Sequence, residues 1–194
     1  MRRLLLILLL TLATRADVRF SFELRGKETL RGVATVAADA PGRGPRLRLE
    51  AGGVLVWSDG ETVDVIDSRR RTHTYSTYSR AGLALLAEST HGVADPFALT
   101  DWWKRYETYK PKDGGTSMIR GVKCNVKELR IGSRRWRWHF GAVDGLLRRE
   151  ERLSSKEMVD YFDVAYVRNK IGPRPAVPAG FTSREFRPAP PNTR

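Results

Sequence analysis

The sequence is poor in cysteine and histidine. Cys124 is the only cysteine among 194 residues, so no disulfide can form within the chain and packing must hold the fold. Val122 and Val126 share a strand face with Cys124, which favours a buried thiol over a reactive or intermolecularly paired one. The three histidines stand singly, and no His or Cys pair has the spacing of metal ligands. We therefore expect no metal site.

Catalytic motifs are scarce as well. The chain has no Gly-x-Ser-x-Gly turn, no glycine-rich phosphate loop and no His-Glu-x-x-His pattern. Glu150 and Glu151 are adjacent, so on a strand they point to opposite faces and cannot act as a paired acid and base. We expect a protein that is not an enzyme and that needs no cofactor.

Acidic residues are outnumbered, with 22 against 35 basic ones and a net charge of +13. Such a balance favours anionic partners, which include lipid headgroups, a membrane surface and nucleic acid. Arginine greatly outnumbers lysine, and a GC-rich genome would produce that usage without any binding role, so both interpretations stay open.

The first 16 residues have the pattern of a secretion signal. Met-Arg-Arg is followed by an apolar run from Leu4 to Leu10 and by a short exit that ends at Ala16. The run is shorter than the roughly 20 residues that span a bilayer, which favours a cleaved signal peptide over an anchoring helix. No cysteine near the exit could carry a lipid. We expect a soluble monomer in the periplasm that has no nucleic-acid partner.

The rest of the chain fits one domain, residues 17–188, followed by a Pro-rich tail, residues 189–194. Apolar and polar residues alternate along it with the period of a strand, as in Val18, Phe20 and Phe22. The Ser58-Asp59-Gly60 turn between two β-branched runs predicts a hairpin. Further strands are predicted over residues 18–24, 30–36, 47–49, 71–77, 104–109, 116–122, 124–131, 135–140, 145–153 and 158–168.

Two segments have helical patterns instead. Residues 79–88 begin with a Ser79 cap, and residues 96–103 follow Asp95 with proline in the first helical position. The apolar face of residues 124–131 changes side, which predicts a bulge near Lys127. The pattern as a whole predicts a mainly β fold with short helices, in which a strongly curved antiparallel sheet is covered on one face.

Several segments resemble the LolA-like superfamily of periplasmic lipoprotein carriers. They are the signal peptide, residues 45–49 (Pro-Arg-Leu-Arg-Leu), residues 54–63 around the Ser-Asp-Gly turn, residues 121–126, residues 144–150 and the segment that ends at Phe186. The resemblance implies an incomplete barrel of about eleven strands, closed on its open side by helices over an apolar cavity for acyl chains. The chain departs from the carrier itself: Asp17 leads directly into the first strand, Gly44 replaces an arginine, and Asp64 and Ile66 replace aromatic residues.

The resemblance implies a soluble carrier or chaperone that shields the acyl chains of a lipid or lipoprotein between envelope membranes, with donor and acceptor proteins as further partners. The alternative is a sensor or regulatory module of the same superfamily. A third interpretation is a cavity filled by its own side chains. The expected lipid-binding residues are Phe20, Phe22, Trp57, Trp136, Trp138 and Phe140 as lining, with Leu83, Leu85, Leu86, Trp102 and Trp103 as cover.

Overall fold

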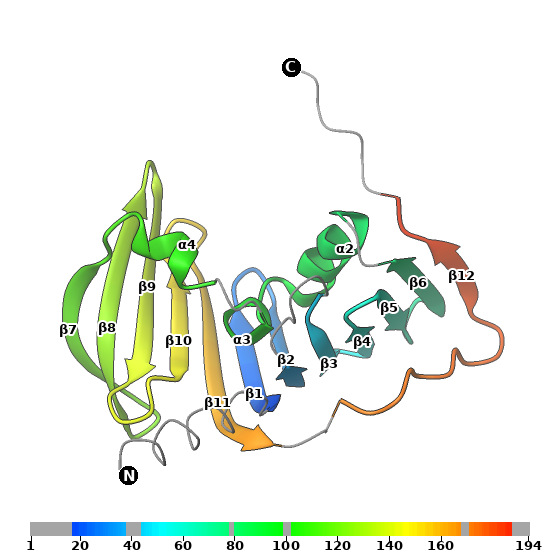
Figure 1. Cartoon of the computed structure of the whole chain (residues 1–194), viewed down its shortest axis with the longest axis horizontal. Coiled ribbons are helices and arrows are strands. Elements are labelled where there is room, and N and C mark those ends of the chain that lie inside the picture. The colour runs from blue at the N-terminus through cyan, green and yellow to red at the C-terminus, as the bar shows by residue number, and fades with distance from the viewer. Residues whose placement is uncertain (1–16, 38–43, 78–79, 99–101, 168–170, 188–194) are drawn as a thin grey trace, which may run out of the picture.

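The computed structural model describes residues 17–37, 44–77, 80–98, 102–167 and 171–187; the predicted signal peptide and Pro-rich tail lie outside them. The described residues form one twelve-stranded sheet, shown in Figure 1. The first six strands are β1 (Asp17–Arg25), β2 (Thr29–Ala37), β3 (Arg46–Ala51), β4 (Val54–Asp59), β5 (Thr62–Asp67) and β6 (Thr72–Thr77). The others are β7 (Lys112–Ile119), β8 (Val122–Ile131), β9 (Arg134–Gly141), β10 (Leu147–Arg152), β11 (Glu157–Val167) and β12 (Thr182–Glu185). Within the same ranges, the helices α2 (Arg80–Thr90), α3 (Asp95–Ala98) and α4 (Lys104–Glu107) lie between β6 and β7.

Two antiparallel meanders make up the sheet. β1 to β6 and β7 to β11 each pair in chain order, and the long pairing of β1 with β11 joins them. The strand order is β12-β6-β5-β4-β3-β2-β1-β11-β10-β9-β8-β7, and of these strands only β12 is parallel to its neighbour. At the predicted hairpin, Asp59 Oδ1 accepts hydrogen bonds from the backbone N–H of Glu61 and Thr62, both at 2.8 Å. Gly60 there has a φ of 89°, which explains the glycine.

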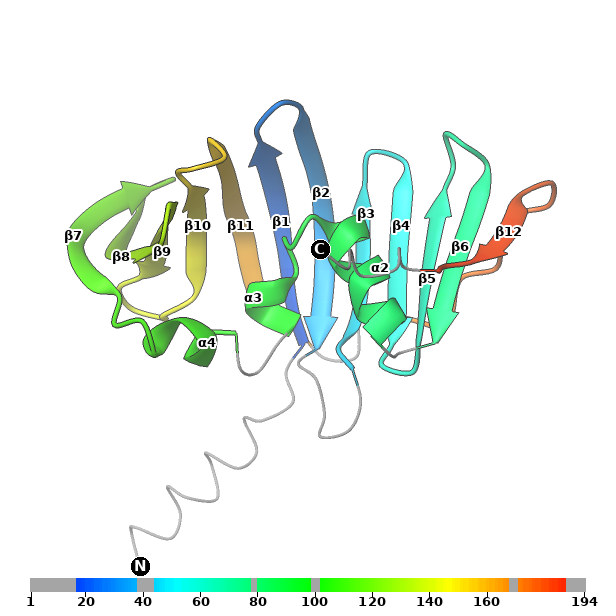
Figure 2. The ribbon, with the colours of Figure 1, turned by 90° about the horizontal axis from the view of Figure 1, so that it is seen from above.

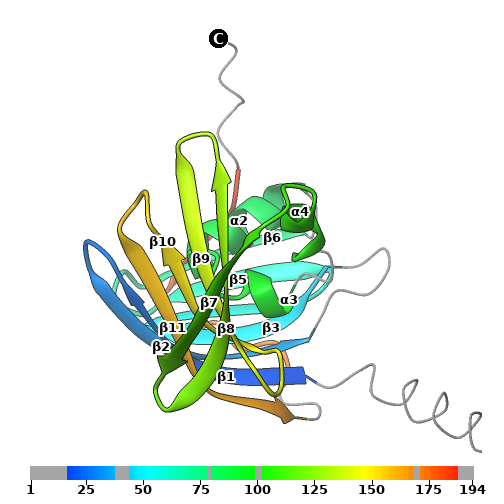
Figure 3. The ribbon, with the colours of Figure 1, turned by 90° about the vertical axis from the view of Figure 1, so that its left-hand side faces the viewer.

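The sheet twists strongly, and α2, α3 and α4 lie on one of its faces, here called the inner face. Figure 2 shows the helices on that side, and Figure 3 shows β8 and β9 running across the direction of β1 to β3. The main core lies between sheet and helices, and it includes the fully buried Phe20, Phe22, Leu47, Val56 and Trp138. Among the described residues, no helix combines the length and hydropathy needed to cross a bilayer.

The fold class predicted from the sequence is confirmed, because the structure is a curved and unclosed β sheet with short helices on one face. The predicted strand over residues 104–109 is wrong: residues 104–107 form α4 instead. Trp102, Trp103 and Tyr106 have the spacing of one helical face, and all three rings contact Trp138. β12, which the sequence did not predict, brings the strand number to twelve within the described ranges.

The predicted bulge near Lys127 lies on the neighbouring strand. β8 keeps a continuous register with β9, whereas β7 has an irregularity between Asp113 and Thr116, opposite Lys127 and Asn125. A Cβ atom at Gly114 would lie 2.9 Å from Val126 Cγ1, so β7 passes too close to β8 there for a larger residue. Cys124 is free and buried beside this irregularity, and burial raises the pKa of its thiol.

Candidate functional site

A pocket of about 450 Å³ opens on the inner face, between the sheet and the segment that carries α3. Binding sites for small molecules commonly measure roughly 300–1,000 Å³ and have mostly apolar walls. The walls here are supplied by α3, by the turn before α4, by β8, by the end of β9 and by the turn into β10. They consist of Pro96, Phe97, Trp102, Trp103, Asn125, Lys127, Phe140, Gly145, Leu146 and Leu147.

The turn between β9 and β10 shapes one end of the pocket. The backbone N–H of Gly141 donates to the carbonyl of Leu146 at 2.8 Å, and the N–H of Leu146 donates to Asp144 Oδ1 at 3.0 Å. Gly145 has a φ of 68°, which a side chain would disfavour. This compact turn therefore places Leu146 and Leu147 beside Phe140 in the pocket wall.

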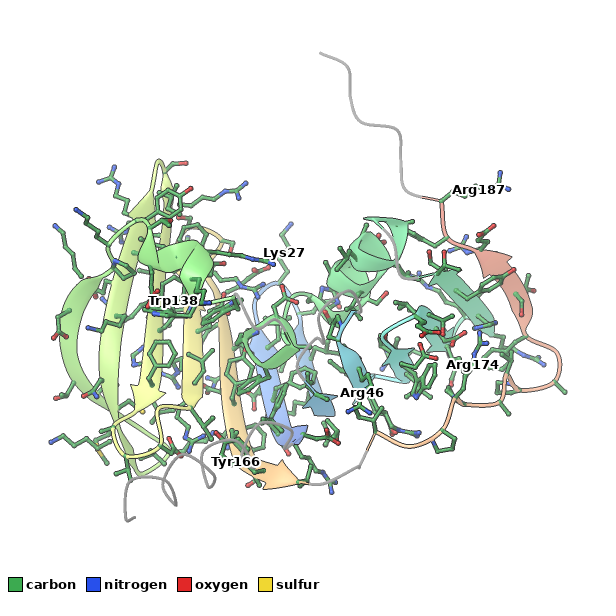
Figure 4. All side chains as sticks on the ribbon, viewed as in Figure 1. Lys27, Arg46, Trp138, Tyr166, Arg174 and Arg187 are labelled. Atoms are coloured by element: carbon green, nitrogen blue, oxygen red, sulfur yellow. The ribbon has the colours of Figure 1, made fainter. Side chains whose placement is uncertain are left out.

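Aromatic rings form the wall next to the core. Trp103 meets Phe140 edge to face, with ring centroids 5.3 Å apart, and it meets Trp138 in the same way at 5.7 Å. Phe97 packs on Phe20 with ring centroids 4.4 Å apart. Figure 4 labels Trp138, which lies beneath α4 and is completely buried. These contacts fix the ring orientations and leave Trp103 and Phe140 partly exposed to the pocket.

A polar cluster lies against the same aromatic core. Asp95 at the start of α3, Glu150 and Arg152 on β10, and the ring of Tyr161 on β11 interact electrostatically. Burial, reinforced by the charge of Glu150, raises the pKa of Asp95 from 3.8 to about 6. Burial also raises the pKa of Tyr161, whose hydroxyl has no hydrogen-bond partner among the described residues. The cluster places a titratable carboxylate on the helix that covers the pocket.

Three of the residues predicted from the sequence, Trp102, Trp103 and Phe140, line the pocket. Six other predicted residues lie in the hydrophobic core beside the pocket, and of these six only Trp136 is partly exposed. These are Phe20, Phe22, Leu85, Leu86, Trp136 and Trp138. These side chains pack against one another, and a pocket remains open beside them.

Two predicted lining residues lie away from the pocket. Trp57 is on the outer face of the sheet, where it packs with Ala37 and Ile171 and its indole N–H donates to the carbonyl of Gly172 at 3.4 Å. Leu83 is on the solvent side of α2, where the residue is 43% exposed. Alternation along a strand does not tell which of its two faces points into the core. The segment around Ile171, which covers Trp57, has no sequence pattern that predicts this contact.

The sequence prediction missed the remaining wall residues, which include Phe97, Asn125, Lys127, Leu146 and Leu147. A signal was present for two of them. Leu146 and Leu147 follow the Asp144-Gly145 turn directly, and a hairpin turn at that point brings them to the same end of the sheet as Phe140. Asn125 and Lys127 had no such signal, because their face of β8 depends on the register with β9.

Two chains of hydrogen bonds join a serine, a histidine and a carboxylate on the outer face. In the first, His73 Nε2 lies 2.8 Å from Asp64 Oδ1, and His73 Nδ1 lies 3.1 Å from Ser183 Oγ. Arg174 also donates two hydrogen bonds to Asp64, at 2.8 and 2.9 Å. These bonds join β12 and the segment before it to β5 and β6.

The second chain is Ser117, His139 and Glu151. Ser117 Oγ lies 2.7 Å from His139 Nδ1, and His139 Nε2 lies 3.0 Å from Glu151 Oε1. Burial lowers the pKa of His139, although Glu151 acts in the opposite direction. The serine is again on an edge strand, β7, and the bonds reach across β8. Within the described ranges, no group of three or more His, Cys, Asp or Glu side chains could hold a metal ion.

No protein-family model and no curated protein matches the sequence. Solved structures with a similar fold include an uncharacterized conserved protein from Thermus thermophilus, with a TM-score of 0.56 and 10% identity over 95% of this chain and 98% of that one. MucB in complex with MucA(peri) matches with a TM-score of 0.41 and 15% identity over 83% and 52% of the two chains. A LolA superfamily protein, NE2245 from Nitrosomonas europaea, matches with a TM-score of 0.33 and 12% identity over 80% and 86%.

The Thermus protein has the fold of this chain over nearly its whole length, and at this identity the likeness is one of fold alone. A LolA superfamily member is also among the structural neighbours. The scores of the LolA superfamily member and of MucB are too low to support a conclusion about function. Any conclusion about function therefore rests on the structure of the pocket.

Proposed function

We propose that this protein binds the acyl chain of a lipid or lipoprotein in the inner-face pocket and shields it from water as a soluble carrier in the periplasm. The observation that supports the proposal is a 450 Å³ pocket whose walls are mostly aromatic and aliphatic. Burial of a methylene group contributes about 0.8 kcal/mol, so a hydrocarbon chain binds such a pocket without specific hydrogen bonds. The predicted signal peptide is consistent with export, and the role needs no membrane-spanning helix.

The proposal predicts how affinity depends on chain length. Each added methylene should strengthen binding about fourfold, the equivalent of about 0.8 kcal/mol, until the pocket is full. Titration of fatty acids of increasing length measures this series through tryptophan fluorescence, because Trp102 and Trp103 line the pocket. Native mass spectrometry of the protein purified from a periplasmic extract tests whether it carries such a ligand. A bare polypeptide mass together with no binding of any fatty acid would refute the proposal.

A substitution that fills the pocket with a larger side chain tests the same proposal. Leu146 is half-buried in the wall, so Leu146→Trp should occupy the space and weaken acyl binding at least about tenfold. Leu146→Met conserves the side-chain volume and is the matched control, which should bind like the wild type. Circular dichroism shows whether both variants fold. If Leu146→Trp folds and binds normally, the ligand does not lie in this pocket.

A further inference from the structure

The pocket has one polar side. Apart from the two tryptophan indoles, the polar side chains that line it are Asn125 and Lys127. Both come from β8, where they lie opposite Phe140 and Trp138 of β9 and therefore share the inner face with these rings. Lys123 is two residues before Asn125 on the same face and is exposed. A row of two ammonium groups and one amide thus borders an otherwise apolar pocket.

Lys127 has no counter-charge among the residues that the structure describes. Glu128, its neighbour in sequence, pairs with Arg137 at 2.6 Å. Asp113 lies opposite Lys127 on β7, but its carboxylate accepts a hydrogen bond from the backbone N–H of Gly115 at 3.1 Å. No carboxylate in the described part of the chain comes within 4.0 Å of the Lys127 ammonium. Lys127 is half-buried as a residue, and its ammonium group is stabilised when an anion pairs with it.

From this arrangement we infer that the ligand is an anionic amphiphile. Its carboxylate or phosphate head is held by Lys127 and Asn125, and its hydrocarbon chain lies among Phe97, Trp103 and Phe140. This inference rests on the proposed function, since it adds a head group to the acyl chain in the same pocket. Lys123 at the exposed end of the row attracts the head group during entry. The expected ligand is therefore a molecule that carries an anionic head group on its hydrocarbon chain, and neutral lipids are expected to bind less tightly.

The experiment compares head groups on one chain. Dodecanoate, dodecyl phosphate and neutral dodecanol are titrated against the wild type below their micelle concentrations, with tryptophan fluorescence as the signal. We expect both anions to bind at least about tenfold more tightly than dodecanol and to lose that advantage as salt is added. The ratio between the two anions identifies whether the site prefers the carboxylate or the phosphate.

Variants of Lys127 locate the effect. Lys127→Gln should weaken dodecanoate binding about tenfold and leave dodecanol binding unchanged, while Lys127→Arg keeps the charge and most of the affinity. Lys27→Gln removes the same charge at the β1–β2 turn, outside the walls of the pocket, and should change neither affinity. The inference is overturned if dodecanol binds as tightly as dodecanoate and Lys127→Gln changes nothing. If none of the three ligands binds the wild type, the proposed function fails with it.

Discussion

Asp95 gives the most quantitative prediction, because its environment differs between the folded and unfolded states. Its carboxyl lies at the start of α3, where burial and the charge of Glu150 raise the pKa from 3.8 to about 6 against the opposing effect of Arg152 and Arg105. The folded protein therefore binds this proton more tightly than the unfolded chain does. Ionised Asp95 destabilises the fold, with no penalty well below pH 3.8 and the full penalty above about pH 6.

The rise from 3.8 to about 6 corresponds to roughly 3 kcal/mol of stability lost at neutral pH. Asp95→Asn removes the charge and keeps the shape, so the variant should exceed the wild type in stability by an amount that grows with pH across this window and then levels off near about 3 kcal/mol. Urea unfolding, followed by tryptophan fluorescence at a series of pH values, measures the difference.

The difference between variant and wild type isolates Asp95, since every other titrating group is common to both proteins. Glu88→Gln, which removes an exposed carboxylate on α2, is the matched control for the loss of one negative charge. A flat or falling difference for Asp95→Asn would refute the reasoning. The same variant should also slow the release of a bound acyl chain at neutral pH, because α3 forms part of the pocket wall.

Other predictions concern packing. Gly32→Ala should cost about 2–3 kcal/mol in urea unfolding, because its Cβ would lie 2.4 Å from the carbonyl oxygen of Glu50 on β3. Trp57→Ala should cost about 3–5 kcal/mol through the cavity left on the outer face, yet the folded variant should bind fatty acid like the wild type. Arg174→Gln leaves the buried Asp64 with fewer donors and should cost about 1–2 kcal/mol, with faster proteolysis of residues 171–187. Cys124 should react with a thiol reagent only in denaturant, because it is buried.

Much of the sheet could be predicted from the sequence, since alternation is a local property. Val18, Phe20 and Phe22 indicate a strand with one apolar face, and the Asp59-Gly60 turn fixes a hairpin register without any distant contact. The wrong strand prediction for residues 104–109 also came from using local alternation alone. A short run with Tyr106 between charged residues fits a strand as well as a helical turn, and contact with Trp138 decides in favour of the helix.

The pocket was harder to predict, because its composition depends on long-range pairing. Trp57 and Trp138 both lie on strands in which apolar and polar residues alternate. Only the segment around Ile171 shows that Trp57 is covered on the outer face of the sheet. Lys127 belongs to the pocket because β8 and β9 keep one register, which places it opposite Trp138. β12 was missed because a parallel pairing with β6 between distant parts of the chain leaves no local pattern, as Ser183 and His73 at a separation of 110 residues illustrate.

The two serine-histidine-carboxylate chains fasten β12 and β7, the strands at the two ends of the sheet. An unclosed sheet presents unpaired backbone groups at such ends, and another chain can add its own strand there. β12 has only four residues, and β7 is interrupted at Gly114 and Gly115, so both offer a poor template as long as they stay in place. By holding these strands in place, the buried His73 and His139 keep both ends of the sheet poor templates for self-association.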